Sequence, residues 1–344
     1  MLDDPQKIKE IDKEGMLTIL ENFPEQIEEI IEQLDIDILP FQPEVIVVAG
    51  MGGSGIVGDI LKSFLAHRIS VPIYVNKDYS IPSFVDKNTL FFAISYSGNT
   101  EETLNATRKA IERGAKVIAI SSGGEMEKIC EENEKLLIKA PRGYPPRGAI
   151  AFMFIPVLKL LSEMLIYDSD VDLIDTISEI KKLRDRIKLD VETEKNEAKK
   201  LAKRLYRKIP VIYGHSIYNA VANRWHTQFN ENSEILSWYG ALPEMNHNEI
   251  VGWKGDKNAD IFAPVLLRCK EEDDRINKRI ELTKKMVFED VSDDIIEVMA
   301  EGDTPLAKIL YLIYLGDYVS IYLALLYDRD PSPVDIIDEL KKRL

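Results

Sequence analysis

Cysteine is scarce in this sequence, and its scarcity excludes two kinds of protein. The chain has 344 residues and only two cysteines, Cys130 and Cys269. That is too few for the disulfide framework of a small secreted protein or for a cysteine-based metal site. With 45% hydrophobic residues, the chain can instead bury a sizeable core, and its length suggests about two domains. We expect no metal centre.

Positive charge is also in deficit. Lysine and arginine number 44 against 59 aspartate and glutamate residues, which gives a formal net charge of −15. A broad nucleic-acid surface needs clustered cations, so we expect no nucleic-acid partner. An anionic ligand would need a local arrangement of hydrogen-bond donors rather than a general positive field.

A signal peptide and a membrane span are not expected either. The first residues, MLDDPQKIKEID, are charged and lack an apolar run. Residues 304–327 are long and apolar, but Lys308 and Asp317 interrupt them. Ionisable residues near the centre of a span are costly. We therefore expect a buried helix there, at a subunit interface in one interpretation, and a cytoplasmic protein without a membrane partner.

The first half of the chain alternates β-rich runs with helical patterns. The unbroken apolar run VIVVA at 45–49 is typical of a strand buried on both faces. Repeated strand–helix alternation predicts a parallel sheet covered by helices, with ligands beyond the carboxyl ends of the strands. The expected strands are 45–49, 71–75, 90–95, 116–121 and 136–140, and the expected helices are 56–65, 101–113 and 126–133.

A second alternation begins at residues 211–216. The strand–glycine–serine–helix order around Ser54 returns around Ser216, which indicates an internal duplication of structure. We expect N-terminal helices over residues 1–40, one α/β domain over 41–185 and a second one, with the C-terminal helices, over 186–344. The elements expected in the second domain are a helix at 217–229, strands at 260–267 and 294–299 with a helix at 275–288 between them, and a last helix at 334–344.

Hydroxyl groups gather where a predicted strand gives way to a predicted helix. In SYSGNTEET the hydroxyls of Ser95, Ser97 and Thr100 surround one glycine. Free amides and the positive end of the helix dipole converge at such a point, so the loop could hold a phosphate without lysine or arginine. The alternative is an ordinary Ser/Thr-capped helix start. Glu101 and Glu102 favour that alternative slightly, since they already complement the dipole.

A glycine-rich turn, GMGGSG at 50–55, adds a second contact at the same sheet edge. Gly50, Gly52 and Gly55 match the dinucleotide pattern G-x-G-x-x-G between a strand and a helix. However, no acidic residue that could bind a ribose closes the second strand, and no Gly-Lys-Ser/Thr follows. A nucleotide site remains an alternative, but two such turns better suit a small phosphorylated ligand.

The stretch QFNENSEILSWYGALPEMNHN at 228–248 holds one candidate acid–base pair. Glu231 can accept a proton as a carboxylate, and His247 carries an imidazole that can donate or accept one. Together they could move protons on a substrate without metal or nucleotide. The alternative interpretation is a solvated helix glutamate and an ordinary turn histidine.

These motifs in combination resemble a known family. GMGGSG with SYSGNTEET resembles the sugar isomerase (SIS) domain family. With PPRGAIAF, FNENSE and PEMNHNE, the chain is similar to the bifunctional phosphoglucose/phosphomannose isomerases. The resemblance implies an α/β fold of two SIS-type three-layer domains, each a parallel sheet flanked by helices as in flavodoxin. It also implies a homodimer that interconverts glucose and mannose 6-phosphates with fructose 6-phosphate through a cis-enediolate, without a cofactor.

The resemblance further implies roles for particular residues. Glu231 would shuttle the proton between C1 and C2. His247, in one arrangement from the partner subunit, would contact the substrate and assist ring opening. Arg147 would bind the substrate and face the enediolate oxygens, with Arg142 as the alternative. The phosphosugar would be bound by Gly52, Gly53, Ser54, Ser95, Ser97 and Thr100.

The C-terminal segment carries further implied roles. A lysine there would bind the substrate and assist catalysis: Lys341 matches best, and the adjacent Lys342 is the alternative. Ser332 would help to admit the C2 epimer.

Two other functions compete with this one. The first is a sugar-phosphate sensor, but sensors built on SIS domains usually carry a basic helix-turn-helix or another module, and the sequence predicts none. The second is an SIS isomerase acting on an amino-sugar or pentose phosphate. Amidotransferase-linked versions need an N-terminal cysteine nucleophile, and residue 2 here is Leu2.

Overall fold

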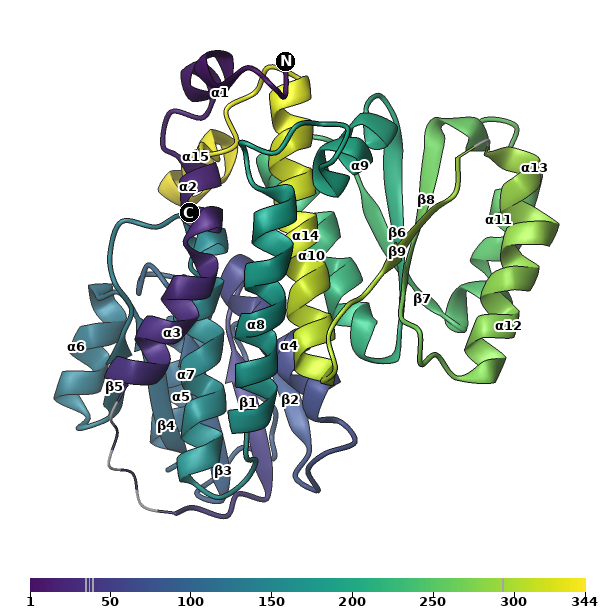
Figure 1. Cartoon of the computed structure of the whole chain (residues 1–344). Helices are drawn as coiled ribbons and strands as arrows, with labels where there is room; N and C mark the ends of the chain where they lie inside the picture. Colours follow the sequence, from purple (N-terminus) through teal and green to yellow (C-terminus); the bar gives the residue numbers. More distant parts are fainter. Residues whose placement is uncertain (35, 37, 39, 293) are drawn as a thin grey trace. The chain divides into compact units, whose positions relative to one another are not determined.

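The chain forms two compact units, each organised around its own parallel sheet (Figure 1). The structure is a computed structural model that describes every residue except 35, 37, 39 and 293. The five-stranded unit comprises Asn22–Ile177, and the four-stranded unit comprises Met1–Glu21 and Ser178–Leu344. The domain boundaries expected from the sequence stay predictions. Part of the expected N-terminal helical region, at residues 35, 37 and 39, lies outside the described residues.

The sheet of the five-stranded unit is wholly parallel, in the order β2-β1-β3-β4-β5. All five strands lie at or within two residues of their expected positions. Every residue of β3 is buried, since helices cover both faces of the sheet. The strands are β1 (Val45–Ala49), β2 (Ile73–Asn76), β3 (Thr89–Ile94), β4 (Lys116–Ser121) and β5 (Leu136–Lys139).

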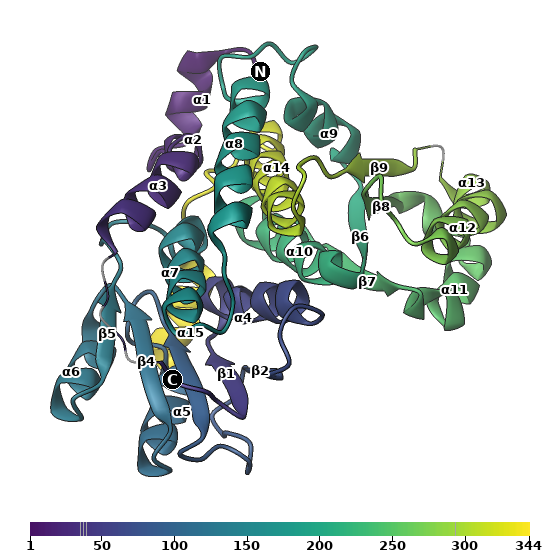
Figure 2. The ribbon, with the colours of Figure 1, turned by 60° about the horizontal axis from the view of Figure 1, so that its bottom comes forward.

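Helices form a layer on each face of this sheet (Figure 2). α5 (Glu101–Glu112) and α6 (Gly124–Glu132) pack on the face that presents Val47, Phe91 and Val117. α4 (Gly52–Leu65) packs on the opposite face, beside Val48. Two more helices complete that layer, since α7 packs against α4 and α3 packs against α7. They are α3 (Phe23–Gln33) and α7 (Ile150–Glu163).

The four-stranded unit repeats this topology. Its sheet is parallel in the order β7-β6-β8-β9, which has the same chain connectivity as β2-β1-β3-β4. The fold class expected from the sequence, two parallel sheets flanked by helices, is confirmed. One strand, β7, was not expected. The strands are β6 (Ile209–His215), β7 (Trp238–Leu242), β8 (Phe262–Arg268) and β9 (Ile296–Met299).

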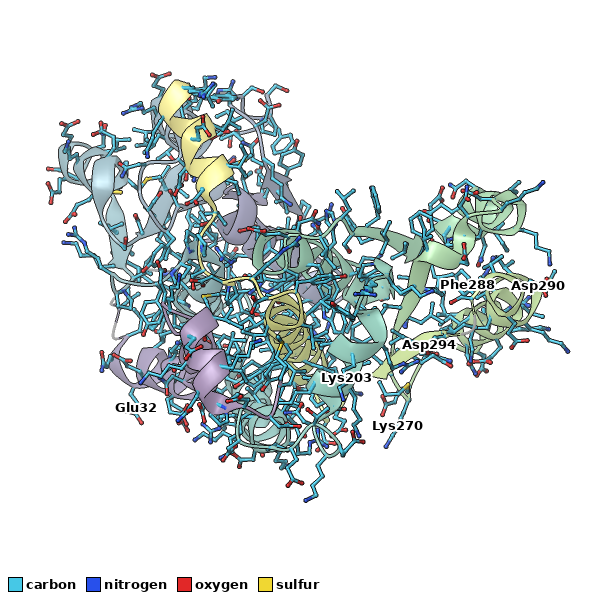
Figure 3. All side chains as sticks on the ribbon, turned by 90° about the horizontal axis from the view of Figure 1, so that it is seen from above. Glu32, Lys203, Lys270, Phe288, Asp290 and Asp294 are labelled. Carbon is cyan, nitrogen blue, oxygen red and sulfur yellow. The ribbon has the colours of Figure 1, made fainter. Side chains whose placement is uncertain are left out.

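Helices again cover both faces. α10 (Asn219–Asn232) packs on one face and against α14 (Pro305–Leu326), which in turn packs against α9 (Glu197–Leu205). The other face carries a core in which Phe288, labelled in Figure 3, is fully buried. The elements on that side are α11 (Glu249–Gly255), α12 (Asp274–Thr283), η5 (Lys284–Phe288) and α13 (Glu289–Val291).

The remaining elements connect or terminate these layers. They are α1 (Pro5–Ile11), α2 (Met16–Glu21), η1 (Pro146–Gly148), α8 (Asp170–Ile187), η2 (Ser216–Tyr218), η3 (Glu244–His247), η4 (Ala259–Ile261) and α15 (Asp335–Arg343).

Helix α14 is the apolar segment that the sequence singled out. Its length and composition would suit a membrane span, but 94% of its most apolar window is buried inside the chain. The expectation of a buried helix is therefore confirmed. Since its own chain covers it, the apolarity of α14 gives no reason for a second subunit, and its interpretation as an interface helix is not supported. The homodimer stays a prediction.

Candidate active site

The glycine-rich turn places Ser54 inside the first turn of a helix. α4 begins at Gly52, which has a φ of +51°, and not at Ile56 as the helical pattern predicts. The pattern misses the true start because glycines are poor helix formers, and only tertiary packing holds them in a helix. Ser54 is buried, and its Oγ accepts a hydrogen bond from the backbone N of Tyr96 at 3.2 Å.

Arg147 lies directly against this turn. A Cβ atom added at Gly53 would lie 3.2 Å from the Cα and the N of Arg147, so a glycine is needed for the two segments to approach so closely. Arg147 belongs to η1 and is only 2% exposed. Arg142, in contrast, is exposed, and its Nε donates to the carbonyl of Ser122 at 3.0 Å. Only one of the two candidate arginines is therefore packed against the glycine turn.

The hydroxyl-rich loop follows β3 at the same end of the sheet. Ser95 is fully buried, and its Oγ donates to Oγ1 of Thr100 at 3.0 Å. Thr100 is the N-cap residue of α5, yet its side chain makes no cap hydrogen bond to the described part of the helix. An ordinary cap would satisfy an amide of the first turn. Among the described residues, the Thr100 hydroxyl accepts from Ser95 and does not cap the helix as the alternative requires, so the amides of the first turn are candidates for binding an anion.

Two further hydroxyls belong to this loop. Ser97 is exposed, and its Oγ accepts a hydrogen bond from the backbone N of Asn99 at 3.3 Å. Thr103, in the first turn of α5, is 2% exposed, and among the described residues its Oγ1 has no hydrogen-bond partner. Sequence reasoning gave Thr103 no role. Its spacing from Thr100 was the available signal, because residues three apart share one face of a helix.

The matching position in the four-stranded unit is filled by the protein itself. Beyond the ends of β6 and β8, Glu272 accepts hydrogen bonds from Nε and Nη2 of Arg268, the latter at 2.8 Å. His215 Nε2 lies 3.4 Å from Oε1 of the same carboxylate. Burial alone would raise the pKa of Glu272, but the contacts from His215 and Arg268 outweigh it and lower the pKa to about 2. A buried charged network thus stands where the five-stranded unit has hydroxyls, so the candidate anion site lies in the five-stranded unit.

Glu231 lies in the last turn of α10 and is half-buried. Its two neighbours anchor the helix end on either side. Asn230 Nδ2 donates to the carbonyl of His226 at 2.7 Å, and Asn232 Nδ2 donates to Oγ of Ser320 on α14 at 2.8 Å. In the motif FNENSE, hydrogen bonds therefore hold the side-chain amides of both asparagines that flank Glu231.

His247 ends η3 and is exposed. The asparagines on either side of it are held by hydrogen bonds. Asn246 Nδ2 donates to Oγ1 of Thr283, and Asn248 Nδ2 donates to Oε1 of Glu244, both at 2.8 Å. The imidazole is thus presented to solvent on a fixed backbone.

The C-terminal candidates differ in exposure. Lys341 and Lys342 are both exposed on α15, and nothing in their surroundings favours one of them. Ser332 is 5% exposed. The structure therefore brings the Gly53–Ser54 turn, Ser95, Thr100 and Arg147 together in the five-stranded unit. It places Glu231, His247 and Lys341 on three separate elements of the four-stranded unit.

No group of three or more His, Cys, Asp or Glu side chains able to hold a metal ion occurs among the residues that the structure describes. The candidate residues are instead hydroxyls, amides and one buried arginine in the five-stranded unit, and acid–base side chains in the four-stranded unit.

Both halves of the chain match known domain families. Residues 41–162 match the SIS domain, and residues 194–344 match the bacterial phospho-glucose isomerase C-terminal SIS domain. A crystal structure of a glucose-6-phosphate isomerase like protein from Thermus thermophilus shares the fold, with a TM-score of 0.65. It has 19% identity and is matched over 99% of this chain and 98% of that one.

Two relatives are more similar in sequence. A bifunctional phosphoglucose/phosphomannose isomerase from Caldicellulosiruptor bescii is 40% identical over 94% of this chain and 97% of its own. A D-glucosamine-6-phosphate 4-epimerase from Sulfolobus acidocaldarius is 30% identical over 67% of this chain and 71% of its own. The chain thus belongs to the bifunctional phosphoglucose/phosphomannose isomerase family of phosphosugar isomerases.

Proposed function

We propose that this protein interconverts glucose 6-phosphate and mannose 6-phosphate with fructose 6-phosphate through a cis-enediolate. The observation that carries the proposal is the buried Arg147, packed against the Gly53 turn beside the hydroxyl-rich loop. A phosphate-binding loop alone would suit any phosphosugar protein. A buried arginine whose backbone packs against Gly53 could supply positive charge for an anion that forms during the reaction.

In this proposal the hydroxyls and helix amides hold the phosphate of the sugar. Ser54, Ser95, Ser97 and Thr100 supply the hydroxyls, and the first turns of α4 and α5 supply amides. Binding energy at the remote phosphate fixes C1 and C2 of the substrate in place for proton transfer. An acidic protein can hold its anionic substrate in this way with few basic side chains.

Proton transfer falls to Glu231 in the proposal. After ring opening, assisted by His247, the carboxylate removes the proton from C2 or C1. The carboxylic acid that results exchanges this proton with solvent and then protonates the other carbon. The enediolate that forms carries negative charge, which Arg147 stabilises. Because the enediol is planar at C2, reprotonation on either face gives the glucose or the mannose configuration. Lys341 or Lys342 would contact the sugar, and Ser332 would help to admit the C2 epimer.

The proposal also includes a second copy of the chain. His247 is exposed in its own subunit, which is compatible with its acting on a substrate held by a partner. We therefore propose a homodimer. Its existence can be measured directly by sedimentation or light scattering.

The alternative is another phosphosugar reaction on the same site. The similarity to a D-glucosamine-6-phosphate 4-epimerase favours this alternative specifically. An epimerase would invert C4 of an amino sugar and leave C2 untouched. A sensor without catalysis is less favoured, because it would have no use for Glu231 or for Arg147 beside the anion site.

Proton NMR of fructose 6-phosphate with the protein in heavy water tests the proposal. We expect glucose and mannose 6-phosphates to form, each with deuterium at C2. A parallel sample with glucosamine 6-phosphate tests the epimerase. Conversion of glucosamine 6-phosphate to its C4 epimer, with fructose 6-phosphate left unchanged, would overturn the proposal in favour of the alternative.

A further inference from the structure

Tyr96 occupies the centre of the hydroxyl-rich loop but does not present a hydroxyl to the anion site. It lies between Ser95 and Ser97, and its side chain is only 6% exposed. Its phenol bonds to the backbone of the segment that follows β5. A large aromatic residue in a loop of small polar residues needs a structural reason.

The hydrogen bonds of Tyr96 give that reason. Its backbone N donates to Oγ of Ser54 at 3.2 Å, and its backbone O accepts from the N of Ser122 at 2.9 Å. Its phenol donates to the carbonyl of Pro141 at 2.8 Å and accepts from the backbone N of Tyr144 at 2.9 Å. One residue of the loop after β3 thus connects the first turn of α4 with the segments that follow β4 and β5.

The phenol contacts bear directly on Arg147. Pro141 and Tyr144 belong to the segment between β5 and η1, and Arg147 is the central residue of η1. The Tyr96 phenol fixes this segment from one side, and close packing on Gly53 fixes it from the other. The position of the guanidinium relative to the phosphate hydroxyls therefore depends on both contacts.

We propose that Tyr96 is a positioning residue that holds the Arg147 segment in register with the phosphate-binding loop. This inference rests on the proposed function. The phenol touches neither substrate nor reacting atoms, and it acts through Arg147 alone. Burial raises the pKa of the phenol, so it remains a neutral donor at the pH of an assay.

Loss of the phenol should affect the transition state more than substrate binding. Without it, the Pro141 carbonyl and the Tyr144 amide lose their partner, and the arginine segment is free to shift. A small displacement of a charged group that acts on the enediolate lowers turnover. The hydroxyls that hold the phosphate keep their own contacts, so substrate affinity should change little.

The test compares Tyr96→Phe, which keeps the ring, with wild type on fructose 6-phosphate. We expect kcat to fall about tenfold and KM to stay within about twofold. Two inhibitors separate the effects: 5-phospho-D-arabinonohydroxamate resembles the enediolate, and sorbitol 6-phosphate carries only the phosphate and hydroxyls. Compared with wild type, Tyr96→Phe should bind the hydroxamate more weakly and sorbitol 6-phosphate equally well. Tyr167→Phe, which removes another phenol of the same unit that donates to Asp172, is the matched control and should behave as wild type.

A double variant distinguishes positioning from general loosening. In an Arg147→Ala background, Tyr96→Phe should lower kcat no further, because its effect acts through the guanidinium that has been removed. Incorporation of 4-aminophenylalanine at position 96 keeps a donor at the same place and should restore much of the activity. That protein also serves as the test if Tyr96→Phe does not fold.

Three results would overturn the inference. They are an additive loss in the Arg147→Ala background, equal weakening of both inhibitors, and wild-type kcat in Tyr96→Phe. The same assay separates this failure from that of the proposed function. If wild type does not convert fructose 6-phosphate, the proposed function fails. If wild type is active and Tyr96→Phe is unaffected, only the role of Tyr96 fails.

Discussion

At the scale of single residues, burial separates two arginines of one segment. Arg147 is buried against the Gly53 turn, whereas Arg142 is exposed and bonded to a carbonyl. We predict that Arg147→Ala lowers kcat about 10²-fold while KM changes little, because the guanidinium acts on charge present only in the transition state. Arg142→Ala is the matched control. Steady-state kinetics on fructose 6-phosphate measures kcat and KM of both variants. A larger loss of kcat in Arg142→Ala would assign stabilisation of the enediolate to Arg142.

Glu231 permits a second prediction at this scale. Glu231→Gln keeps the size of the side chain and removes the base. We expect turnover to fall by about 10²–10⁴-fold, the usual contribution of a general base, together with loss of deuterium exchange at C2. Sorbitol 6-phosphate should still bind, since the hydroxyl loop belongs to other elements. Retained exchange would remove Glu231 as the base. Glu234→Gln, an exposed residue of the same motif, is the control.

At the scale of elements, the end of α10 is fixed to α14. Ser320 Oγ accepts from Nδ2 of Asn232 and donates to the carbonyl of Asp317, and the carbonyl of Ser320 accepts from Oγ of Ser233. Beyond the helix, Arg329 Nη1 donates to the carbonyl of Ser233 at 2.7 Å. The carboxylate of Glu231 is therefore carried by a helix end whose position α14 determines.

We predict that Ser320→Ala lowers both stability and turnover. It leaves the buried amide of Asn232 without its acceptor, which costs about 1–3 kcal/mol of the free energy of unfolding. Because the helix end that carries Glu231 loosens, C2 exchange should slow as well. Ser237→Ala removes another buried hydroxyl, bonded to the carbonyl of Pro210, and should lower stability alone. Equal exchange rates in the two variants would show that Ser320 does not position Glu231.

At the scale of the whole molecule, the two sheets share a topology and differ in what lies at their carboxyl edges. In the five-stranded unit the edge carries hydroxyls and amides. In the four-stranded unit it carries Glu272 with Arg268 and His215, a buried charged network. The same topology thus carries a candidate anion site in one unit and a buried charged network in the other.

This network makes stability depend on pH. The pKa of Glu272 falls from its ordinary value of 4.5 to about 2 in the folded protein. Its contribution to stability is therefore complete above about pH 5 and is lost as the pH falls toward 2. We predict that Glu272→Gln is less stable at pH 7 by on the order of 3 kcal/mol. Its stability should also change less between pH 5 and pH 3 than that of wild type.

Tryptophan fluorescence during urea unfolding measures this effect. Trp225, Trp238 and Trp253 all lie in the four-stranded unit, so the signal reports on the unit that contains Glu272. Glu289→Gln, which changes an exposed glutamate, should leave the pH dependence as in wild type. An unchanged dependence in Glu272→Gln would assign the acid sensitivity to other groups.

Local patterns were enough to predict much of the fold and part of the site. Buried strands such as β1 and β3 could be predicted because short, unbroken apolar runs between polar or turn residues are typical of strands buried on both faces. Strand β7 was missed. Trp238 and Tyr239 are about half exposed, and a Cβ added at Gly240 would lie 2.6 Å from the ring of Tyr213. In the sequence a glycine suggests a loop. The reason for this glycine is the ring of Tyr213, which is distant in the chain and therefore not evident from the local pattern.

The sequence by itself determined the two-sheet architecture, the hydroxyl-rich loop and the candidate acid–base residues. Each follows from residues adjacent in the chain, through periodicity, turn chemistry or motif. Only the tertiary structure decided that Arg147 and not Arg142 adjoins the glycine turn and that the second sheet edge is filled by its own charges. It also decided that the Thr100 hydroxyl accepts from Ser95 and makes no cap hydrogen bond to the described part of α5. These outcomes depend on which distant backbones come close enough to exclude water, and spacing along the chain does not encode that.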